Sequence, residues 1–313
     1  MKIYITTPVG GAGLWIYEGY KNAWQKAGYD VEFIQTIPTD TPSEYDAMIT
    51  EVSLYQQPLD TIAPFLTNAR RAYLMVQPNV YPEPWGNHPN WRSMSSDEFI
   101  ALVNSLDNVH LWGFGRSEGK LALPGEVEKE VKTAFFPKWK KINYVPLAFD
   151  DIGYQPQKNP AYEFDVCFVG GWADNGFNEK QRIMLEYLGE VSKLKLKMGI
   201  FINQGVSIQD EANLQINSKI ALNLHDEYQR VVGLDLNERT FKSLGLTGFL
   251  VCDEVAEIKN LFPDVPTART AQNFSGLVDR HLTYMDKEIK DKNRQNILEN
   301  HTYTNRINSF LEL

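Results

Sequence analysis

The segment from Ile220 to Glu254 carries the residue types best suited to holding an anion. It reads IALNLHDEYQRVVGLDLNERTFKSLGLTGFLVCDE, which predicts a strand, a loop, a helix, a turn of small residues and a second strand. Asn237 can cap the predicted helix by accepting from a free backbone N–H, and Arg239 falls in the first turn. Free amides, the positive end of the helix dipole and a guanidinium then converge, which suits a diphosphate. A capped helix with a surface arginine fits the same spacing.

Two loops in the first half of the chain could bind a second ligand, because each follows a predicted strand. The first is a glycine-rich turn, where the backbone can approach a ligand closely. The second spans residues 77–88 and is stiffened by prolines. The candidate residues of the two loops are Gly10, Gly11, Gly13, Tyr81, Glu83, Trp85 and His88. Glu83 or His88 could act as a general base, although each also fits an exposed loop group.

The run Asn237–Phe241, followed by Gly245, Thr247–Leu250 and Asp253, resembles the donor-site segment of GT-B glycosyltransferases. Those enzymes have two Rossmann-like domains with a central cleft. The run is most similar to that of the spore-maturation CgeB-like glycosyltransferases. The resemblance implies an enzyme that transfers a sugar, hexosyltransferase-like (EC 2.4), from a nucleoside-diphosphate sugar, most simply a UDP-sugar, to a hydroxyl acceptor.

Two further segments share the resemblance. Residues 164–188 (FDVCFVGGWADNGFNEKQRIMLEYL) resemble the opening of the family's nucleotide-binding domain, and His301–Tyr303 with Arg306 resembles its C-terminal helix. A fainter similarity runs to the phage DNA glucosyltransferases. The resemblance covers about residues 164–313, whereas the N-terminal half matches only in general layout.

By resemblance, Arg239 would contact the donor diphosphate, and Lys180 or Arg182 would supply a second cation. Two cations and helix amides can offset the charge of a nucleoside diphosphate without a metal, and no cofactor would be required. His225-Asp226, at the end of a predicted strand, is a further candidate for the site or a structural pair. The donor-binding set is therefore Gly170, Gly171, Trp172, Lys180, Arg182, His225, Asn237, Arg239, Thr240 and Lys242.

Lys242 departs from the family pattern. The family usually has a glutamate three residues after the arginine, where it holds the ribose hydroxyls. A lysine can donate to a hydroxyl but cannot accept from one. Either another residue takes over the ribose, or the donor differs, or donor binding is weak.

The elements needed to position these residues follow from hydrophobic periodicity. Short β-branched runs alternate with helical patterns in both halves, which predicts parallel sheets covered by helices. Strands are expected at 2–6, 31–35, 47–52, 72–76, 109–112, 142–145, 164–169, 196–201, 220–224, 248–252 and 267–268. Helices are expected at 14–27, 59–68, 97–106, 180–191, 210–217, 237–244, 256–261, 274–284, 287–299 and 304–311, the second despite Pro64.

The pattern stops near residue 150 and restarts near 164. The stretch DDIGYQPQKNPAYE has no period and reads as a linker. We therefore expect an N-terminal Rossmann-like acceptor-side domain at 1–150, a linker at 151–163, a nucleotide-sugar-binding Rossmann-like domain at 164–300 and a C-terminal helix at 301–313.

Composition limits the partners. The formal net charge of −9 disfavours nucleic acid, although it does not exclude a locally basic face. Cys167 and Cys252 lie in apolar runs and indicate neither a disulfide framework nor a metal site. No apolar stretch is long enough for a membrane span, and the N-terminus reads as a strand rather than a signal peptide, so we expect a cytoplasmic enzyme.

Two other functions stay open. One is a degenerate GT-B protein that binds a sugar or nucleotide without turnover, which Lys242 favours. A DNA-base glycosyltransferase of the phage type is a variant of the glycosyltransferase hypothesis. A dinucleotide-dependent oxidoreductase is weaker, because Gly10–Gly13 does not fit G-x-G-x-x-G. The donor base, the sugar, the acceptor and the stereochemical outcome are not fixed by the sequence.

Overall fold

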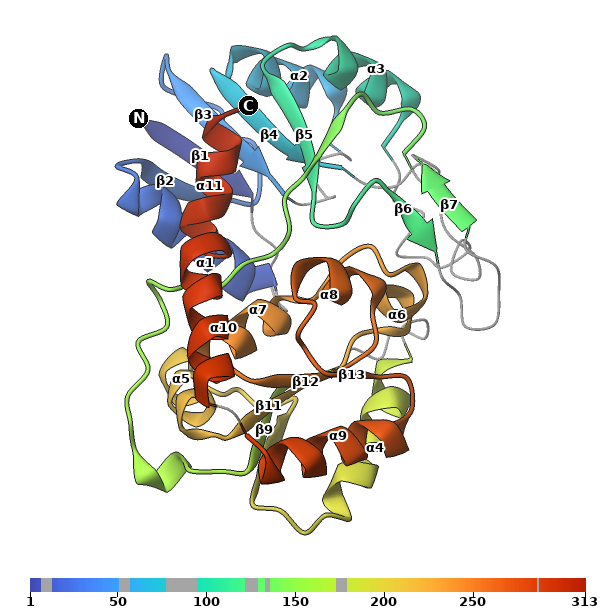
Figure 1. The fold of residues 1–313 in the computed structure, drawn as a ribbon. Helices are drawn as coiled ribbons and strands as arrows, with labels where there is room; N and C mark the ends of the chain where they lie inside the picture. The colour runs from blue at the N-terminus through green and yellow to red at the C-terminus, as the bar shows by residue number, and fades with distance from the viewer. Residues whose placement is uncertain are drawn as a thin grey trace. The chain divides into compact units, whose positions relative to one another are not determined.

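The computed structural model describes residues 1–6, 13–50, 57–76, 95–121, 129–132, 136–172, 179–285 and 287–313. The chain forms two compact units, each built on a parallel sheet with helices packed against it (Figure 1). Unit 1 contains Met1–Lys120, Lys129–Pro146 and Tyr303–Leu313, and unit 2 contains Leu121–Glu128 and Leu147–Thr302. The expected α/β class with two Rossmann-like units is confirmed.

Unit 1 has a six-stranded sheet in the order β2-β1-β3-β4-β5-β8, in which neighbouring strands pair in parallel. The order reverses between β1 and β3, which is the topological switch point of this sheet. The strands are β1 (Lys2–Thr6), β2 (Asp30–Ile34), β3 (Tyr45–Ile49), β4 (Arg71–Met75), β5 (Val109–Gly113) and β8 (Ile142–Tyr144). The helices are α1 (Gly13–Lys26), α2 (Leu59–Asn68), α3 (Asp97–Ser105) and α11 (Tyr303–Leu311).

The last helix of the chain belongs to unit 1 because it packs on α1. Gly19 of α1 lies so close to the Tyr303 ring that a Cβ there would come within 2.4 Å of it. Phe310 is fully buried, and the Arg306 Nε donates to the Pro146 carbonyl at 2.8 Å. The C-terminal residues are thus needed to complete the core of the N-terminal unit.

Helix α2 forms with Pro64 inside it, as expected. Ile62, Phe65 and Leu66 are buried, so packing outweighs the one backbone hydrogen bond that proline removes. Two short strands, β6 (Glu118–Leu121) and β7 (Lys129–Lys132), pair with each other and were not predicted from the sequence. Both are polar and only four residues long, so they carry no clear period.

Unit 2 has a five-stranded parallel sheet in the order β10-β9-β11-β12-β13. Its switch point lies between β9 and β11. The strands are β9 (Val166–Gly170), β10 (Met198–Ile202), β11 (Ile220–Asn223), β12 (Leu250–Asp253) and β13 (Thr267–Ala268). The helices are α4 (Lys180–Ser192), α5 (Ile208–Asn217), α6 (Glu227–Val232), α7 (Glu238–Leu246), α8 (Ala256–Leu261), α9 (Ala271–Thr283) and α10 (Lys287–Asn300), with a 3-10 helix at Pro160–Tyr162.

The expected linker, residues 151–163, is bound to α5 by hydrogen bonds. Asn213 and Asn217 accept from the backbone N–H groups of Gln157 and Asn159 at 2.8 and 2.9 Å. Asn217 also donates to the Gln157 carbonyl at 2.9 Å. Side-chain amides of the helix therefore fix this segment on unit 2, which hydrophobic periodicity cannot reveal.

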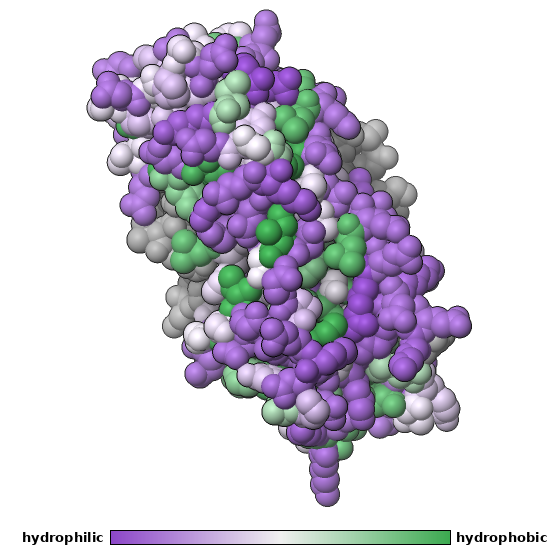
Figure 2. Space-filling model, turned by 90° about the vertical axis from the view of Figure 1, so that its left-hand side faces the viewer, coloured by the Kyte–Doolittle hydropathy of each residue, from purple (hydrophilic) through white to green (hydrophobic). Residues whose placement is uncertain are grey.

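Among the residues that the structure describes, no helix has the length and apolar character needed to cross a membrane. On the face shown in Figure 2, hydrophobic residues form small separate spots among hydrophilic ones. Such scattered apolar side chains are ordinary on a protein surface.

Candidate functional site

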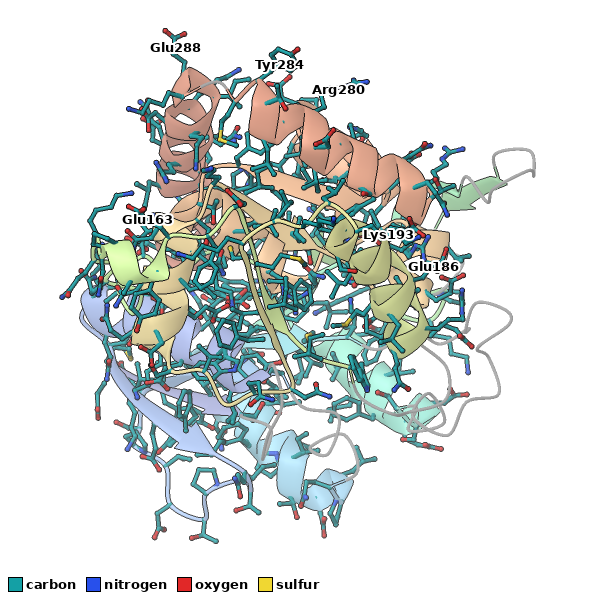
Figure 3. The ribbon with its side chains drawn as sticks, turned by 90° about the horizontal axis from the view of Figure 1, so that it is seen from below. Glu163, Glu186, Lys193, Arg280, Tyr284 and Glu288 are labelled. Carbon is teal, nitrogen blue, oxygen red and sulfur yellow. The ribbon has the colours of Figure 1, made fainter. Side chains whose placement is uncertain are left out.

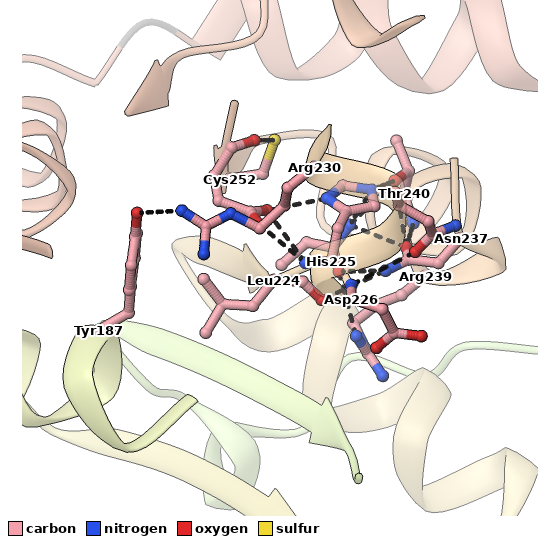
Figure 4. Close-up of polar contacts among 12 residues, drawn as sticks. Tyr187, Leu224, His225, Asp226, Arg230, Asn237, Arg239, Thr240 and Cys252 are labelled. Carbon is pink, nitrogen blue, oxygen red and sulfur yellow. Dashed lines mark hydrogen bonds and ion pairs between the residues drawn. The ribbon is translucent and has the colours of Figure 1, made fainter. Parts of the chain in front are cut away.

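The residues best placed to hold an anion lie at the carboxyl ends of β9 and β11, the switch point of the unit 2 sheet. Gly170 ends β9 and Asn223 ends β11. Helix α7, which carries Arg239, begins beside them. Figure 4 shows its first residues, Asn237, Arg239 and Thr240, grouped with His225. In open α/β sheets, ligands bind at this position because the flanking loops diverge there.

Arg239 is held in place by three contacts within unit 2. Its Nε donates to the Val169 carbonyl at 2.7 Å, and its Nη1 donates to Asn223 Oδ1 at 3.0 Å. The guanidinium carbon lies 4.7 Å from the centroid of the Phe168 ring. Burial lowers the pKa of Arg239, but nearby carboxylates oppose the shift and the group stays charged. The side chain is half-buried and held by these contacts, so it is not the freely exposed surface arginine that the same spacing also allowed.

The two glycines at the end of β9, Gly170 and Gly171, are required by their neighbours. A Cβ on Gly170 would lie 2.0 Å from Arg239 Nη2, and one on Gly171 would lie 1.9 Å from Asn203 Oδ1. Asn203 also accepts from the Trp172 backbone N–H at 3.1 Å. The lack of side chains thus lets the guanidinium lie directly against Gly170 and the Asn203 amide lie directly against Gly171.

A network of amide side chains orders the start of α7. Asn237 caps the helix, because its Oδ1 accepts from the Thr240 backbone N–H at 3.2 Å. Asn223 donates to Asn237 Oδ1 and to Thr240 Oγ1, both at 2.9 Å. Asn223 was not predicted from the sequence, although a polar residue near the end of an apolar strand is a usable signal.

His225 and Asp253 form a fully buried pair behind this network. The His225 Nδ1 lies 2.8 Å from Asp253 Oδ1, which places the proton on Nδ1 and leaves Nε2 to accept, 3.4 Å from Thr240 Oγ1. Burial opposes ionisation of Asp253, but His225 and Arg230 hold the pKa of Asp253 below its usual value. The suggested His225-Asp226 pair is therefore wrong: the partner of His225 is Asp253.

Asp226 instead pairs with Lys180, at 3.3 Å. The Lys180 ammonium is buried and also donates to the Leu224 carbonyl. Burial and the nearby Arg239 guanidinium lower the pKa of Lys180 to about 8, although Asp226 opposes the shift. Arg182 projects from the same helix but is exposed, where it pairs with Glu179 and Glu186. Lys180 is therefore the cation that the structure brings closer to Arg239.

Lys242 lies in a buried cluster of charges. Its ammonium is 2.9 Å from Glu211 Oε1, 3.3 Å from Glu238 Oε2 and 3.4 Å from the Tyr154 hydroxyl. Burial alone would lower the pKa of Lys242, but the two carboxylates raise it. The position that resembles the family's ribose-binding glutamate is thus occupied by a lysine already engaged with two glutamates.

Most acceptor-side candidates lie outside the described residues: Gly10, Gly11, Tyr81, Glu83, Trp85 and His88. Gly13 is the first residue of α1. At the switch point of unit 1 the structure brings together two buried threonines that sequence reasoning missed. The Thr50 backbone N–H donates to Thr6 Oγ1 at 2.7 Å, which ties the ends of β1 and β3.

Within the described residues, one group of side chains has the composition of a metal site: His225, Cys252 and Asp253, with ligand atoms within 4.8 Å of one another. Hydrogen bonds already use these atoms. Cys252 Sγ donates to the Asp253 carbonyl at 3.0 Å, and burial raises the pKa of the Cys252 thiol well above its usual value. His225 and Asp253 hydrogen-bond to each other and the Cys252 thiol donates to a backbone carbonyl, so these three residues form a buried structural cluster.

Residues 162–312 match the glycosyl transferase-like family. The matched segment contains the whole unit 2 sheet, Arg239 and the network around α7. A search of the curated proteins finds no match.

Solved structures share the fold over the full chain. The phage T4 β-glucosyltransferase in complex with UDP and Mn²⁺ is 12% identical, with a TM-score of 0.56 and coverage of 100% of both chains. AviGT4, a glycosyltransferase of avilamycin A biosynthesis, is 11% identical, with a TM-score of 0.56 and coverage of 100% and 96%. The E. coli trehalose-6-phosphate protein with bound UDP-2-fluoro glucose is 8% identical, with a TM-score of 0.57 and coverage of 100% and 98%. The fold is that of the GT-B glycosyltransferases.

Proposed function

We propose that this protein is a glycosyltransferase that binds a nucleoside-diphosphate sugar at the switch point of the unit 2 sheet. The observation that carries the proposal is the Arg239 guanidinium, fixed against Gly170 beside the N-terminus of α7. A guanidinium, free helix amides and the dipole together favour a diphosphate, and they stabilise it further as it becomes the leaving group. The matching family and the fold support the same reaction class.

The donor is proposed to be a UDP-sugar, since structures of the same fold carry UDP or UDP-sugars. Arg239 and Lys180 would offset the diphosphate charge without a metal ion. Residues 1–150 would form the acceptor side and residues 164–300 the donor domain. Residues 151–163 would link them along the chain while held on unit 2, and 301–313 would supply the closing helix, which packs in unit 1. Glu83 or His88 would serve as the general base toward a hydroxyl acceptor. The net charge of −9 favours a glycan or another uncharged acceptor over DNA.

One observation favours a second function, a GT-B protein that binds a nucleotide without turnover. Lys242 is engaged by Glu211 and Glu238 and offers no acceptor for ribose hydroxyls. Hydrolysis or transfer from a UDP-sugar, measured by release of UDP, separates an active transferase from this alternative.

The site itself is tested by nucleotide binding to an Arg239→Ala variant. A hydrogen bond to a charged group contributes about 1.5–3 kcal/mol, so UDP should bind the variant about 10- to 150-fold more weakly. Arg280→Ala is the matched control, because Arg280 is exposed at the end of α9. Calorimetry should show wild-type affinity in the control and weakened affinity in Arg239→Ala. Equal affinity of all three proteins for UDP would refute the site.

A further inference from the structure

A basic cavity lies in unit 2, at the opposite edge of the sheet from Arg239. Its volume is about 630 Å³. Asp165, Lys197 and Lys219 each stand just before a strand, β9, β10 and β11 respectively. Parallel strands place their amino ends at one edge, and strands of this length separate the two edges by about 15 Å. The cavity is therefore distinct from the proposed donor site.

Positive charge exceeds negative charge in this cavity. One wall is a face of α10, and the others come from the strand starts, the end of α5 and the segment before β9. Its cations are Lys158, Lys197, Lys219, Lys287, Lys290 and Arg294, against the carboxylates Glu163, Asp165 and Asp291. A local excess of three positive charges in a chain of net charge −9 marks this place as unusual.

The internal contacts leave part of this charge unmatched by carboxylates. Lys219 pairs with Asp165 at 2.7 Å, and Arg294 lies 3.4 Å from Asp291. Among the described residues, the Lys290 ammonium donates to the backbone carbonyls of Ser218 and Lys219, at 3.3 and 2.8 Å, and Asp291 is a nearby carboxylate that opposes the loss of its charge. Burial and the nearby Arg294 and Lys158 lower the pKa of Lys290 to about 8.

The cavity also has an apolar wall. Phe164 and Ile216 line it, and the Lys197 ammonium lies 5.1 Å from the centroid of the Phe164 ring. A volume of this size is within the range of small-molecule sites, and larger than a single oxyanion needs. Figure 3 labels Glu163, which lines the cavity, and Glu288 of α10, the helix that forms one cavity wall; both lie on the left of the view.

We propose that this cavity binds a small, multiply charged phosphate-bearing molecule, at a site separate from that of the sugar donor. Lysine and arginine are the residues that bind phosphate groups, and the apolar wall would contact the organic part of the ligand. A concave pocket favours a small molecule over a nucleic-acid backbone, which needs a basic stripe along the surface.

Titration calorimetry of the full chain with inorganic pyrophosphate, at low ionic strength and with UDP saturating, tests the site. The pocket variant is Lys197→Gln with Lys287→Gln, two exposed lysines whose loss should leave the fold intact. The matched control is Lys193→Gln with Lys292→Gln, which removes two exposed charges elsewhere on the same unit. We expect the pocket variant to bind pyrophosphate at least about tenfold more weakly, and the control to bind it as the wild type does.

Proton uptake gives a second readout. A bound anion should raise the pKa of Lys290, so binding at pH 8 should take up a fraction of a proton, seen as heat that depends on the buffer. The proposal is overturned if pyrophosphate does not bind, or if the pocket variant binds it unchanged. Tighter binding of a DNA duplex than of pyrophosphate, lost in the pocket variant, would replace the proposal with a nucleic-acid surface. UDP binding should be unaffected by the pocket variant, so this test can fail while the proposed function stands.

Discussion

Adding one methyl group at Gly170 should weaken donor binding by displacing Arg239. The Cβ of Gly170→Ala would lie 2.0 Å from Arg239 Nη2 and 2.6 Å from Cζ, whereas ordinary contact begins at 3.4 Å. The guanidinium must therefore retreat by about 1.4 Å. Its bond to the Val169 carbonyl is 2.7 Å long, and a shift of that size exceeds the range of a hydrogen bond.

The cost should fall on the ligand more than on the fold, because the atoms displaced are the far end of a flexible side chain. We expect UDP affinity to fall by about 10- to 150-fold, the same range as for removal of the arginine. The free energy of unfolding should fall by about 1–3 kcal/mol, since a half-buried guanidinium loses its partners. Calorimetry with UDP and thermal unfolding measure the two effects.

A double-mutant cycle identifies the cause. If Gly170→Ala acts by displacing Arg239, it should weaken UDP binding little further in an Arg239→Ala background. Gly189→Ala is the matched control, because nothing lies within 4 Å of a Cβ there and the site is inside α4. Fully additive losses in the double variant, or wild-type affinity in Gly170→Ala, would refute the reasoning.

Two further predictions concern buried lysines of unit 2. Lys180 has a pKa of about 8, so UDP affinity should fall as pH rises through 8, by up to about tenfold per unit, because the charged ammonium binds the anion. Calorimetry from pH 7 to 9.5 should show this dependence in the wild type, and an undiminished slope in Lys180→Gln would contradict it. Lys242→Met should lower the free energy of unfolding by about 3–5 kcal/mol, because it leaves Glu211 and Glu238 buried without their cation. Urea unfolding measures this loss. The control Lys193→Met, at an exposed lysine, should change the free energy of unfolding little. Equal stability of the two variants would contradict the prediction.

Local sequence determined most helices and strands, and it identified the start of α7 and the two glycines of the candidate site. Hydrophobic period predicted most strands and helices, since the apolar faces must be buried whatever the topology. Asn237 could be identified as a helix cap and Arg239 as a first-turn residue, because both depend only on positions along one helix. Gly170 and Gly171 were found as a break after an apolar strand.

Contacts between distant segments were decided only by the tertiary structure. Asp253 is 28 residues from His225 and Asn223 is 16 from Arg239, so only the order of β9, β11 and β12 brings them together. The role of Lys242 likewise depends on Glu211 of another helix. Helix α11 joins unit 1 because Gly19 has room for the Tyr303 ring, a fit between residues 284 positions apart that no local pattern encodes.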